Sequence, residues 1–360
     1  MKTQIKKCLM INDSTIDLMR HIDIPNFIIA KNILADFGSI IKDLGLEGKK
    51  LLIVHGERSF KPIARKLNKN LKSGKMLRAF SNSITEVKRL EVEINRTRVD
   101  FVIGIGGGKV LDPAKLASSN AGKSFISIPT TLSHDGIASP VAVIDYGNEV
   151  KSIYAHMPFG VIIDVGIIKQ SPIQNIGAGI GDLLSNISAA EDWLLAEQYG
   201  KFKIDYFALL LAKIPALHLL KNDYRDLKDE DLLKDLAEGL VLSGIAMSIT
   251  GNSRPASGAE HLISHGLDEL LKNRELHGIQ CGIATIFAMG LRGSNEWQRI
   301  KKFYKKLKLP QRPEDIGITK DLFLKAVKIA PKTRTNRFTI LNIIGKNKKL
   351  LFEIYDEVYG

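Results

Sequence analysis

An apolar run that ends in a cluster of glycines constrains this chain more than any other feature. Residues 100–105 are almost entirely apolar, Gly106, Gly107 and Gly108 follow, and an amphipathic pattern opens at Lys109. A buried strand, a tight turn and a helix have this pattern. Because glycines let the backbone approach a ligand and the start of a helix attracts phosphate, the turn indicates an anion site. The competing interpretation is a turn that only links a strand to a helix and binds no ligand. The glycine spacing leaves this open, because it matches neither the Gly-x-Gly-x-x-Gly motif nor a P-loop.

Strand and helix patterns alternate on both sides of this turn. We expect strands over residues 24–30, 50–56, 75–80, 100–105, 124–128 and 160–164, a hairpin over 142–153, and helices over 33–46, 60–71 and 84–96. Alternation of this kind predicts a parallel sheet with ligands beyond the carboxyl ends of its strands. The later pattern is almost wholly helical, over residues 181–197, 203–220, 230–251, 257–271, 276–290, 295–307 and 320–329. Since 360 residues exceed the usual size of one core, we expect two domains, a Rossmann-like α/β domain over 1–168 and an all-α domain over 169–360.

Composition and charge narrow the class of protein. No apolar run is long enough for a membrane span or a signal peptide, so we expect a cytoplasmic protein. Two cysteines, Cys8 and Cys281, are too few for a disulfide framework or a cysteine metal site. The net charge of +13 suits an acidic partner, but the lysines are scattered over helix faces without an aromatic-basic motif. For most of these lysines we therefore favour a solvated, lysine-rich surface, and we expect no nucleic acid. The alternative is a nucleic-acid or membrane-surface binding protein, whose binding would fail at modest salt and ignore zinc.

Three positions in the helical half are candidate metal ligands: Asp182, His261 and His277. Asp182 follows the glycine-rich residues 177–181, which predict a turn, and so it is expected in the first turn of a helix. His261 and His265 are four residues apart and share one helix face. A carboxylate and two imidazoles are a normal ligand set for catalytic zinc. Each residue alone is more often structural, but three of the eight histidines lie within residues 260–277. The sequence thus predicts a cleft with a cofactor on one wall and a metal on the other.

These residues also carry a resemblance to a known family. The motifs are Gly-Gly-Gly-Lys-Val-Leu-Asp at 106–112, the Pro-Thr-Thr-Leu-Ser-His-Asp-Gly run within 129–140, Gly-Ile-Gly-Asp at 179–182, the Ser-Arg-Pro-Ala-Ser-Gly run within 253–265, His277-Gly278, and residues 337–341. The chain resembles the sn-glycerol-1-phosphate dehydrogenases, within the superfamily of iron-containing alcohol dehydrogenases, glycerol dehydrogenases and dehydroquinate synthases. Phe338 stands where the family usually has tyrosine, which affects no catalytic position.

The resemblance implies a dehydroquinate synthase-like fold and a reaction. NADH or NADPH would reduce dihydroxyacetone phosphate to sn-glycerol 1-phosphate for ether phospholipids, with one zinc ion per subunit as Lewis acid, in a homo-oligomer. Asp182, His261 and His277 would hold the zinc. Asp135, Asp182 and His265 would contact the substrate, Asp135 and His265 as catalytic residues and His265 in proton transfer. The dinucleotide would lie against Gly106, Gly107, Gly108, Lys109, Val110, Leu111, Asp112, Thr130, Thr131, Leu132, Ser133 and Ser139.

Several points stay open at this level. Arg254 either binds the substrate phosphate or pairs with an acid such as Glu260. Glu57 would favour NADH and Arg58 would favour NADPH, so the sequence does not indicate which cofactor is preferred. A zinc-dependent glycerol dehydrogenase acting on unphosphorylated polyols is the alternative enzyme. A cyclising lyase of the dehydroquinate synthase type would need further lysine and arginine ligands in motifs that the sequence does not show.

Overall fold

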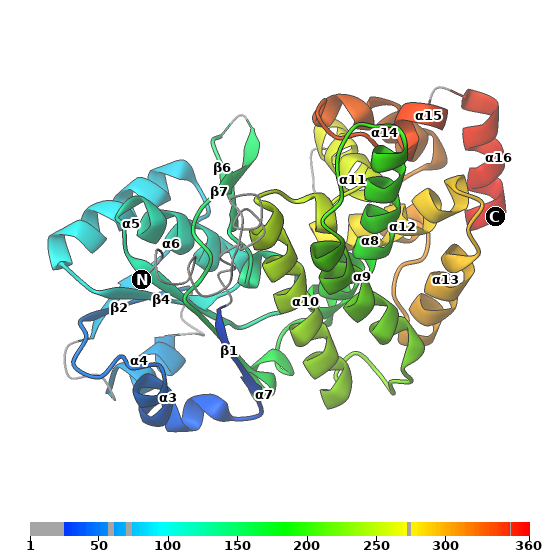
Figure 1. Cartoon of the computed structure of the whole chain (residues 1–360). Coiled ribbons are helices and arrows are strands. Elements are labelled where there is room, and N and C mark those ends of the chain that lie inside the picture. Colours follow the sequence, from blue (N-terminus) through cyan, green and yellow to red (C-terminus); the bar gives the residue numbers. More distant parts are fainter. Residues whose placement is uncertain (1–24, 57–60, 70–73, 148, 272–274, 346) are drawn as a thin grey trace, which may run out of the picture.

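A computed structural model describes residues 25–56, 61–69, 74–147, 149–271, 275–345 and 347–360. Its first half contains a parallel six-stranded sheet with the strand order β1-β8-β5-β4-β2-β3 (Figure 1). The strands are β1 (Asn26–Ala30), β2 (Leu51–His55), β3 (Lys75–Arg78), β4 (Phe101–Gly106), β5 (Ser124–Pro129) and β8 (Gly160–Asp164). The predicted parallel sheet is confirmed. A separate antiparallel hairpin is formed by β6 (Val141–Asp145) and β7 (Val150–Tyr154).

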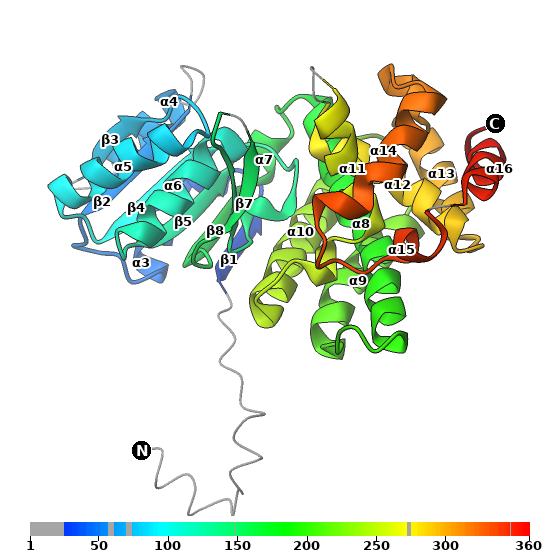
Figure 2. The ribbon, with the colours of Figure 1, turned by 90° about the horizontal axis from the view of Figure 1, so that it is seen from above.

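Helices cover both faces of the sheet (Figure 2). Successive side chains of a strand point to opposite faces, so a strand covered on both sides is apolar throughout. Leu52 and Val54 of β2 pack in the same core as α5 (Ile84–Thr97) and α6 (Gly108–Asn120). Leu51 and Ile53 pack instead in the core that contains α3 (Phe37–Asp43) and α4 (Lys61–Lys69), which follow the short helix η1 (Ile33–Asp36). The helices thus leave only the strand ends open to a ligand.

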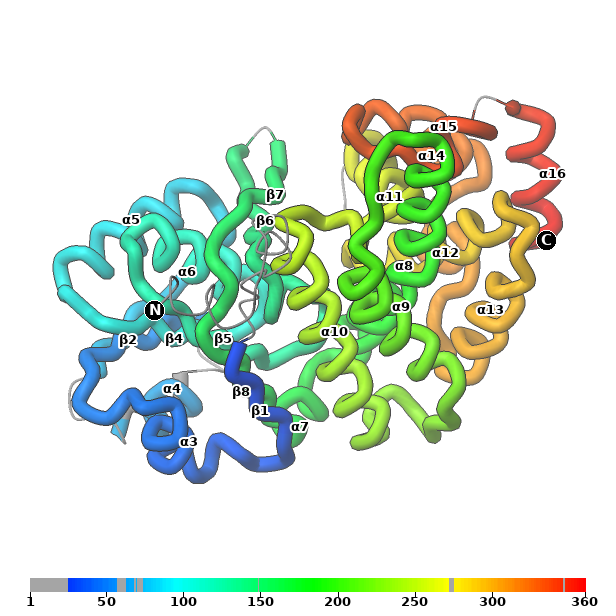
Figure 3. The backbone as a smooth tube through the Cα atoms, viewed as in Figure 1, coloured from blue at the N-terminus to red at the C-terminus, as the bar shows by residue number. Residues whose placement is uncertain are grey.

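The second half is helical, as expected. Its elements are α7 (Val165–Ile168), α8 (Ile173–Gln198), α9 (Tyr206–Lys221), α10 (Glu230–Thr250), η3 (Arg254–Ala256), α11 (Ala259–Leu270), α12 (His277–Leu291), α13 (Glu296–Leu307), η4 (Pro313–Ile316), α14 (Lys320–Thr333), α15 (Ile340–Ile344) and α16 (Lys348–Tyr359). Helix α10 lies between the sheet and the other helices (Figure 3), and it contacts β1, α7 and the short helix η2 (Asp135–Ile137). The sequence analysis missed α15 and α16. Within the described ranges, no helix combines the length and apolarity needed to cross a bilayer.

The glycine-rich residues 177–181 correct one prediction. They lie inside α8, which begins at Ile173, and Asp182 is therefore well inside a long helix rather than in its first turn. The glycines serve close packing instead of a turn. A Cβ atom added at Gly181 would lie 2.0 Å from the carbonyl oxygen of Gly278 in α12. This close approach brings Asp182 next to the start of α12, where His277 lies.

A Gly181→Ala substitution is expected to destabilise the protein by roughly 1–3 kcal/mol, because α8 and α12 must separate to admit the methyl group. Thermal unfolding of the purified variant measures this. The matched control is Gly38→Ala in α3, where an added Cβ atom meets nothing within 4 Å and alanine is the better helix former. Equal melting temperatures for the two variants would contradict the packing role of Gly181.

Candidate active site and metal centre

One cavity of about 2500 Å³ lies between the carboxyl ends of the strands and the helical half. Gly107, Gly108 and Thr131 line it on the sheet side, and His261 and His277 line it on the helical side. The two constellations that the sequence predicts as separate walls therefore face the same space.

The glycine turn forms the sheet-side wall. Strand β4 ends at Gly106, and α6 begins at Gly108 with Gly107 as its N-cap, which provides no capping side chain. The first N–H groups of a helix need acceptors from outside the helix. An uncapped glycine start that opens into a cavity is therefore suited to a phosphate group.

The predicted dinucleotide residues fall into two groups. Gly106, Leu111 and Leu132 are absent from the cavity lining. Leu111 and Leu132 are core residues, at 1% and 0% exposure, and they pack in the interior. The residues that do line the cavity are Gly107, Gly108, Lys109, Val110, Asp112, Thr130, Thr131, Ser133 and Ser139.

A buried lysine that the sequence analysis did not select holds the next loop in place. Lys115 of α6 is 1% exposed. Its Nζ donates to the carbonyl oxygens of Gly136, Ser139 and Val141 at 2.8, 3.0 and 2.5 Å. It also lies 3.5 Å from Oδ1 of Asp112. Lys115 thus fixes the loop that carries Asp135 and Ser139 into the cavity.

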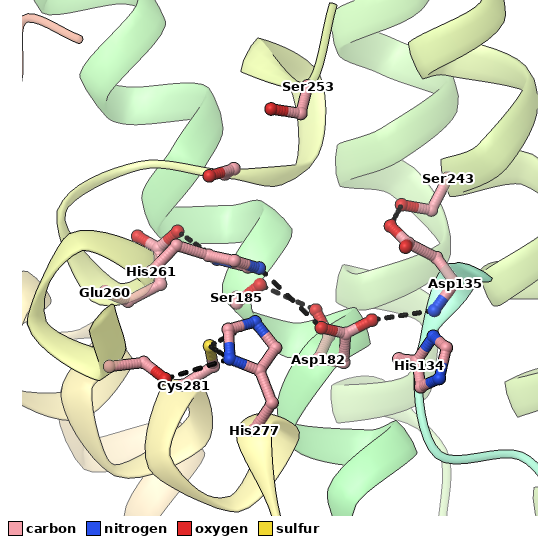
Figure 4. A network of polar contacts seen from close by, with 12 residues as sticks. His134, Asp135, Asp182, Ser185, Ser243, Ser253, Glu260, His261, His277 and Cys281 are labelled. Carbon is pink, nitrogen blue, oxygen red and sulfur yellow. Dashed lines mark hydrogen bonds and ion pairs between the residues drawn. The ribbon is translucent and has the colours of Figure 1, made fainter. Parts of the chain in front are cut away.

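Glu260 orients His261 (Figure 4). Nδ1 of His261 lies 2.9 Å from Oε1 of the fully buried Glu260, which also accepts from the N–H of Gly258. Burial favours the protonated acid, but the bonds from His261 and Gly258 outweigh it and lower the pKa of Glu260. A carboxylate can only accept, so Nδ1 carries the proton and the lone pair of His261 is on Nε2. That Nε2 lies 3.7 Å from Oδ1 of Asp182.

A hydrogen-bond chain orients His277 in the same way. The Oγ of Ser264 donates to Oε1 of Gln280 at 2.6 Å. Because a hydroxyl has one proton, Ser264 must accept from Nδ1 of His277, 2.9 Å away. The lone pair of His277 is therefore also on Nε2. Carboxylate or hydroxyl partners on the distal nitrogen are typical of metal-binding histidines.

The chemistry of this cluster fits a divalent metal ion. Burial, then the nearby Asp135 carboxylate, raises the pKa of Asp182 well above its usual range. Burial, then the neighbouring histidines, holds the pKa of His277 well below its usual range. Neutral imidazoles are the ligand form, and a cation would compensate a buried carboxylate. Ligand atoms about 2 Å from one tetrahedral zinc ion lie roughly 3.3 Å apart, and the Asp182–His261 separation is close to that.

Comparisons with known proteins identify the family. Residues 28–172 match the model of a family described as iron-containing alcohol dehydrogenase. A glycerol-1-phosphate dehydrogenase (NAD(P)+) of Thermococcus sibiricus is 37% identical over 336 residues, which cover 92% of this chain and 95% of that protein. The chain belongs to the glycerol-1-phosphate dehydrogenase family. A relative of the same name from Pyrococcus horikoshii is 39% identical over 326 residues, with 88% of this chain and 92% of the relative covered.

Solved structures show the fold of this glycerol-1-phosphate dehydrogenase family member. A probable glycerol dehydrogenase from Sinorhizobium meliloti has a TM-score of 0.75 at 19% identity, over 94% of this chain and 99% of that one. A glycerol dehydrogenase from Schizosaccharomyces pombe has a TM-score of 0.74 at 20% identity, over 94% and 90% of the chains. The predicted fold class, a parallel-sheet half followed by a helical half, is confirmed.

Cys281 is a further possible ligand that the sequence analysis excluded. Its Sγ lies 3.4 Å from Nε2 of His277, and ligand atoms of His261, His277 and Cys281 all lie within 4.8 Å of one another. Burial raises the pKa of Cys281 well above its usual range, and it raises the pKa of Asp182 in the same direction, so the two shifts do not distinguish these candidate ligands. We keep Asp182 as the proposed third ligand because its Oδ1 faces the Nε2 of His261.

A Glu260→Gln substitution is expected to weaken zinc binding by about 10- to 100-fold, because the carboxylate that orients His261 is lost. Competition with a chromophoric chelator measures the affinity. Glu191→Gln is the control, since Glu191 pairs with Lys213 in the same helical half and is not a cavity residue. Zinc affinity equal to that of the wild type in Glu260→Gln would contradict the orienting role.

The predicted catalytic residues also reach the cavity. Asp135 belongs to η2, where its N–H donates to Oδ2 of Asp182 at 2.8 Å and its Oδ2 accepts from Ser243 of α10 at 2.9 Å. It links the sheet half to two helices. His265 lies beside His277, with ring centroids 5.7 Å apart. Its position one turn after His261 agrees with the expected shared helix face, and its role in proton transfer stays a prediction.

Arg254 lies elsewhere than expected. Its guanidinium is 3.3 Å from the ring centroid of Phe202 and donates to the carbonyl oxygen of Asn336. It neither lines the cavity nor pairs with Glu260, whose carboxylate is held by His261 and Gly258. Arg334 and Arg337 line the cavity instead. The sequence analysis selected neither as a site residue, although Arg337 opens the late motif at 337–341.

Proposed function

We propose that this protein reduces dihydroxyacetone phosphate to sn-glycerol 1-phosphate with NADH or NADPH, for ether phospholipid synthesis. One observation carries the proposal. A donor set of two imidazole Nε2 atoms and a carboxylate faces an uncapped glycine turn across a single cavity. The similarity to proteins named glycerol-1-phosphate dehydrogenase over nine-tenths of the chain supports the substrate.

The proposed chemistry is a hydride transfer to a ketone. A zinc ion held by Asp182, His261 and His277 would supply Lewis-acid polarisation of the ketone oxygen, and the nicotinamide would supply the hydride. The protein would supply orientation. The glycine turn and the loop with Ser139 hold the dinucleotide against the cluster.

Asp135 and His265 are the proposed substrate contacts. Burial raises the pKa of Asp135, so this carboxyl group can hold a proton near a substrate hydroxyl more readily than an exposed aspartate can. His265 lines the same cavity and is the proposed proton donor to the product oxygen. A His265→Asn variant with full turnover and an unchanged pH profile would remove that role.

A substrate comparison tests the proposal against the alternative of a glycerol dehydrogenase. With zinc-loaded enzyme, dihydroxyacetone phosphate is expected to have a kcat/KM at least about 100-fold above that of dihydroxyacetone, since a phosphate adds charged hydrogen bonds. NADH or NADPH consumption is measured at 340 nm. A higher kcat/KM for dihydroxyacetone or for glycerol oxidation would favour the alternative.

The remaining expectations stay predictions. Glu57 and Arg58, the cues to cofactor preference, lie outside the described residues. The domain boundary at residue 168 is also a prediction. The homo-oligomer, the cytoplasmic location and the absence of nucleic-acid binding call for measurements in solution and in cells.

A further inference from the structure

Two arginines, Arg334 and Arg337, line the helical side of the cavity. Their guanidinium groups donate to carbonyl and hydroxyl oxygens rather than to carboxylates. Arg337 is only 7% exposed, and its Nε is buried without a hydrogen-bond partner among the described residues. A buried charge is costly unless it is paired. The cluster therefore has the character of an anion site.

Arg334 and Arg337 converge on one hydroxyl group. Arg334 Nη1 and Arg337 Nη2 donate to Oγ of Ser253 at 3.2 and 2.9 Å. Because both bonds use the lone pairs of this oxygen, its single proton is directed to a further acceptor. Ser253 lines the same cavity as His261 and His277. Two guanidinium forks and a hydroxyl that must donate are the groups that bind a phosphate oxygen.

The cluster spans the cavity toward the sheet half. Arg334 Nη2 donates to Oγ of Ser152 in β7, 3.2 Å away. Arg334 and Arg337 line the same cavity as the proposed metal ligands Asp182, His261 and His277. In dihydroxyacetone phosphate, only a methylene and an oxygen separate the ketone carbon from phosphorus. An anion site next to the metal ligands thus matches the shape of the substrate.

The charges around Arg337 also favour a bound anion. Burial, followed by the positive charges of Arg334 and Arg254, lowers the pKa of Arg337 to about 9. The acids Glu260 and Asp192 oppose this shift less strongly. A dianion between the guanidinium groups would remove their mutual repulsion.

We infer that Arg334 and Arg337, with Ser253 between them, hold the phosphate of the substrate and select phosphorylated over unphosphorylated ketones. The inference rests on the proposed function and adds the residues that determine its specificity. The glycine turn of α6 then keeps the dinucleotide, and the two phosphate sites lie on opposite walls of the cavity.

The test compares Arg334→Gln with wild type in three measurements. KM for dihydroxyacetone phosphate is expected to rise by about 10- to 100-fold, because the loss of one charged hydrogen bond weakens binding by about this factor. Competitive inhibition by inorganic phosphate should weaken by a similar factor. Turnover of dihydroxyacetone should stay within about twofold, since it has no phosphate to bind. This last measurement separates a lost phosphate contact from a damaged catalytic centre.

Two further variants sharpen the result. Arg337→Lys keeps the charge but loses the fork that holds Ser253 and the carbonyl oxygen of Ser257, and we expect a smaller rise in KM. Arg254→Gln is the matched control, because Arg254 does not line the cavity, and its KM should not change. Loss of phosphate inhibition in Arg254→Gln but not in Arg334→Gln would overturn the inference.

Failure of the proposed function is distinguishable from failure of the inference. If wild-type enzyme consumes no NADH or NADPH with dihydroxyacetone phosphate, the proposed function fails. Calorimetry of inorganic phosphate binding to the zinc-loaded protein still tests the arginines directly. Equal phosphate affinity in wild type and Arg334→Gln would refute the phosphate site.

Discussion

Replacing His261 with alanine is expected to lower kcat/KM for dihydroxyacetone phosphate by about 10³-fold or more. His261 is the residue that connects the proposed ligand set, since its Nε2 faces Asp182 and its Nδ1 is held by Glu260. Without it, the buried carboxylate of Asp182 loses the neighbour with which it would share a cation. Loss of a Lewis acid costs several kcal/mol of transition-state stabilisation, and each 1.36 kcal/mol is about tenfold in rate.

Steady-state kinetics and zinc content per chain should fall together in His261→Ala. His156→Ala is the control, because His156 is exposed and is not part of the cavity lining. Retention of one zinc ion per chain with full activity in His261→Ala would show that the metal, if required, is held elsewhere. Added zinc should restore part of the activity if the remaining ligands still bind weakly.

Replacing Lys115 with methionine is expected to cause the largest loss of stability. Lys115 donates to three carbonyl oxygens and lies beside the carboxylate of Asp112. Methionine fills a similar volume but leaves these buried acceptors without their donor. Removing one partner of a buried charged group costs about 3–5 kcal/mol, which corresponds to a fall of roughly 4–7 °C in melting temperature for a protein of this size.

The same variant should also bind the cofactor less tightly, because Lys115 positions the loop with Ser139. Differential scanning fluorimetry and NADH fluorescence titration measure the two effects. Lys109→Met is the matched control from the same helix. Lys109 is exposed beside the glycine turn, so its loss should weaken dinucleotide binding without lowering the melting temperature. A Lys115→Met variant as stable as wild type would contradict the role of the lysine in holding the loop.

The two glycine-rich stretches show what the sequence could predict and what it could not. At residues 106–108 an apolar strand precedes the glycines, and the predicted turn is confirmed by the start of α6. At 177–181 a similar composition suggested a turn, yet the residues are helical. The reason is a contact between Gly181 and Gly278, which are far apart in the sequence. Local composition cannot distinguish a flexible backbone from one that must approach a neighbour closely.

The site residues also differ in whether the sequence could predict them. His261 and His265 could be placed on one face from their spacing, and their proximity to His277 followed from the expected pair of helices. Arg334 and Cys281 carry no such pattern. Each is a single residue that enters the site only because α14 and α12 pack beside α11. Glu260 was noticed as a possible partner of Arg254, but its actual partner is the adjacent His261, a contact that depends on side-chain direction rather than on spacing.

The central claim is that a metal-dependent hydride transfer to dihydroxyacetone phosphate takes place in this cavity. The most direct test is the chirality of the product formed from dihydroxyacetone phosphate and NADH or NADPH, before chelation, after chelation, and after addition of zinc. The account predicts sn-glycerol 1-phosphate, no product after chelation, and recovery with zinc. Formation of sn-glycerol 3-phosphate, or undiminished turnover in the fully metal-free protein, would contradict it.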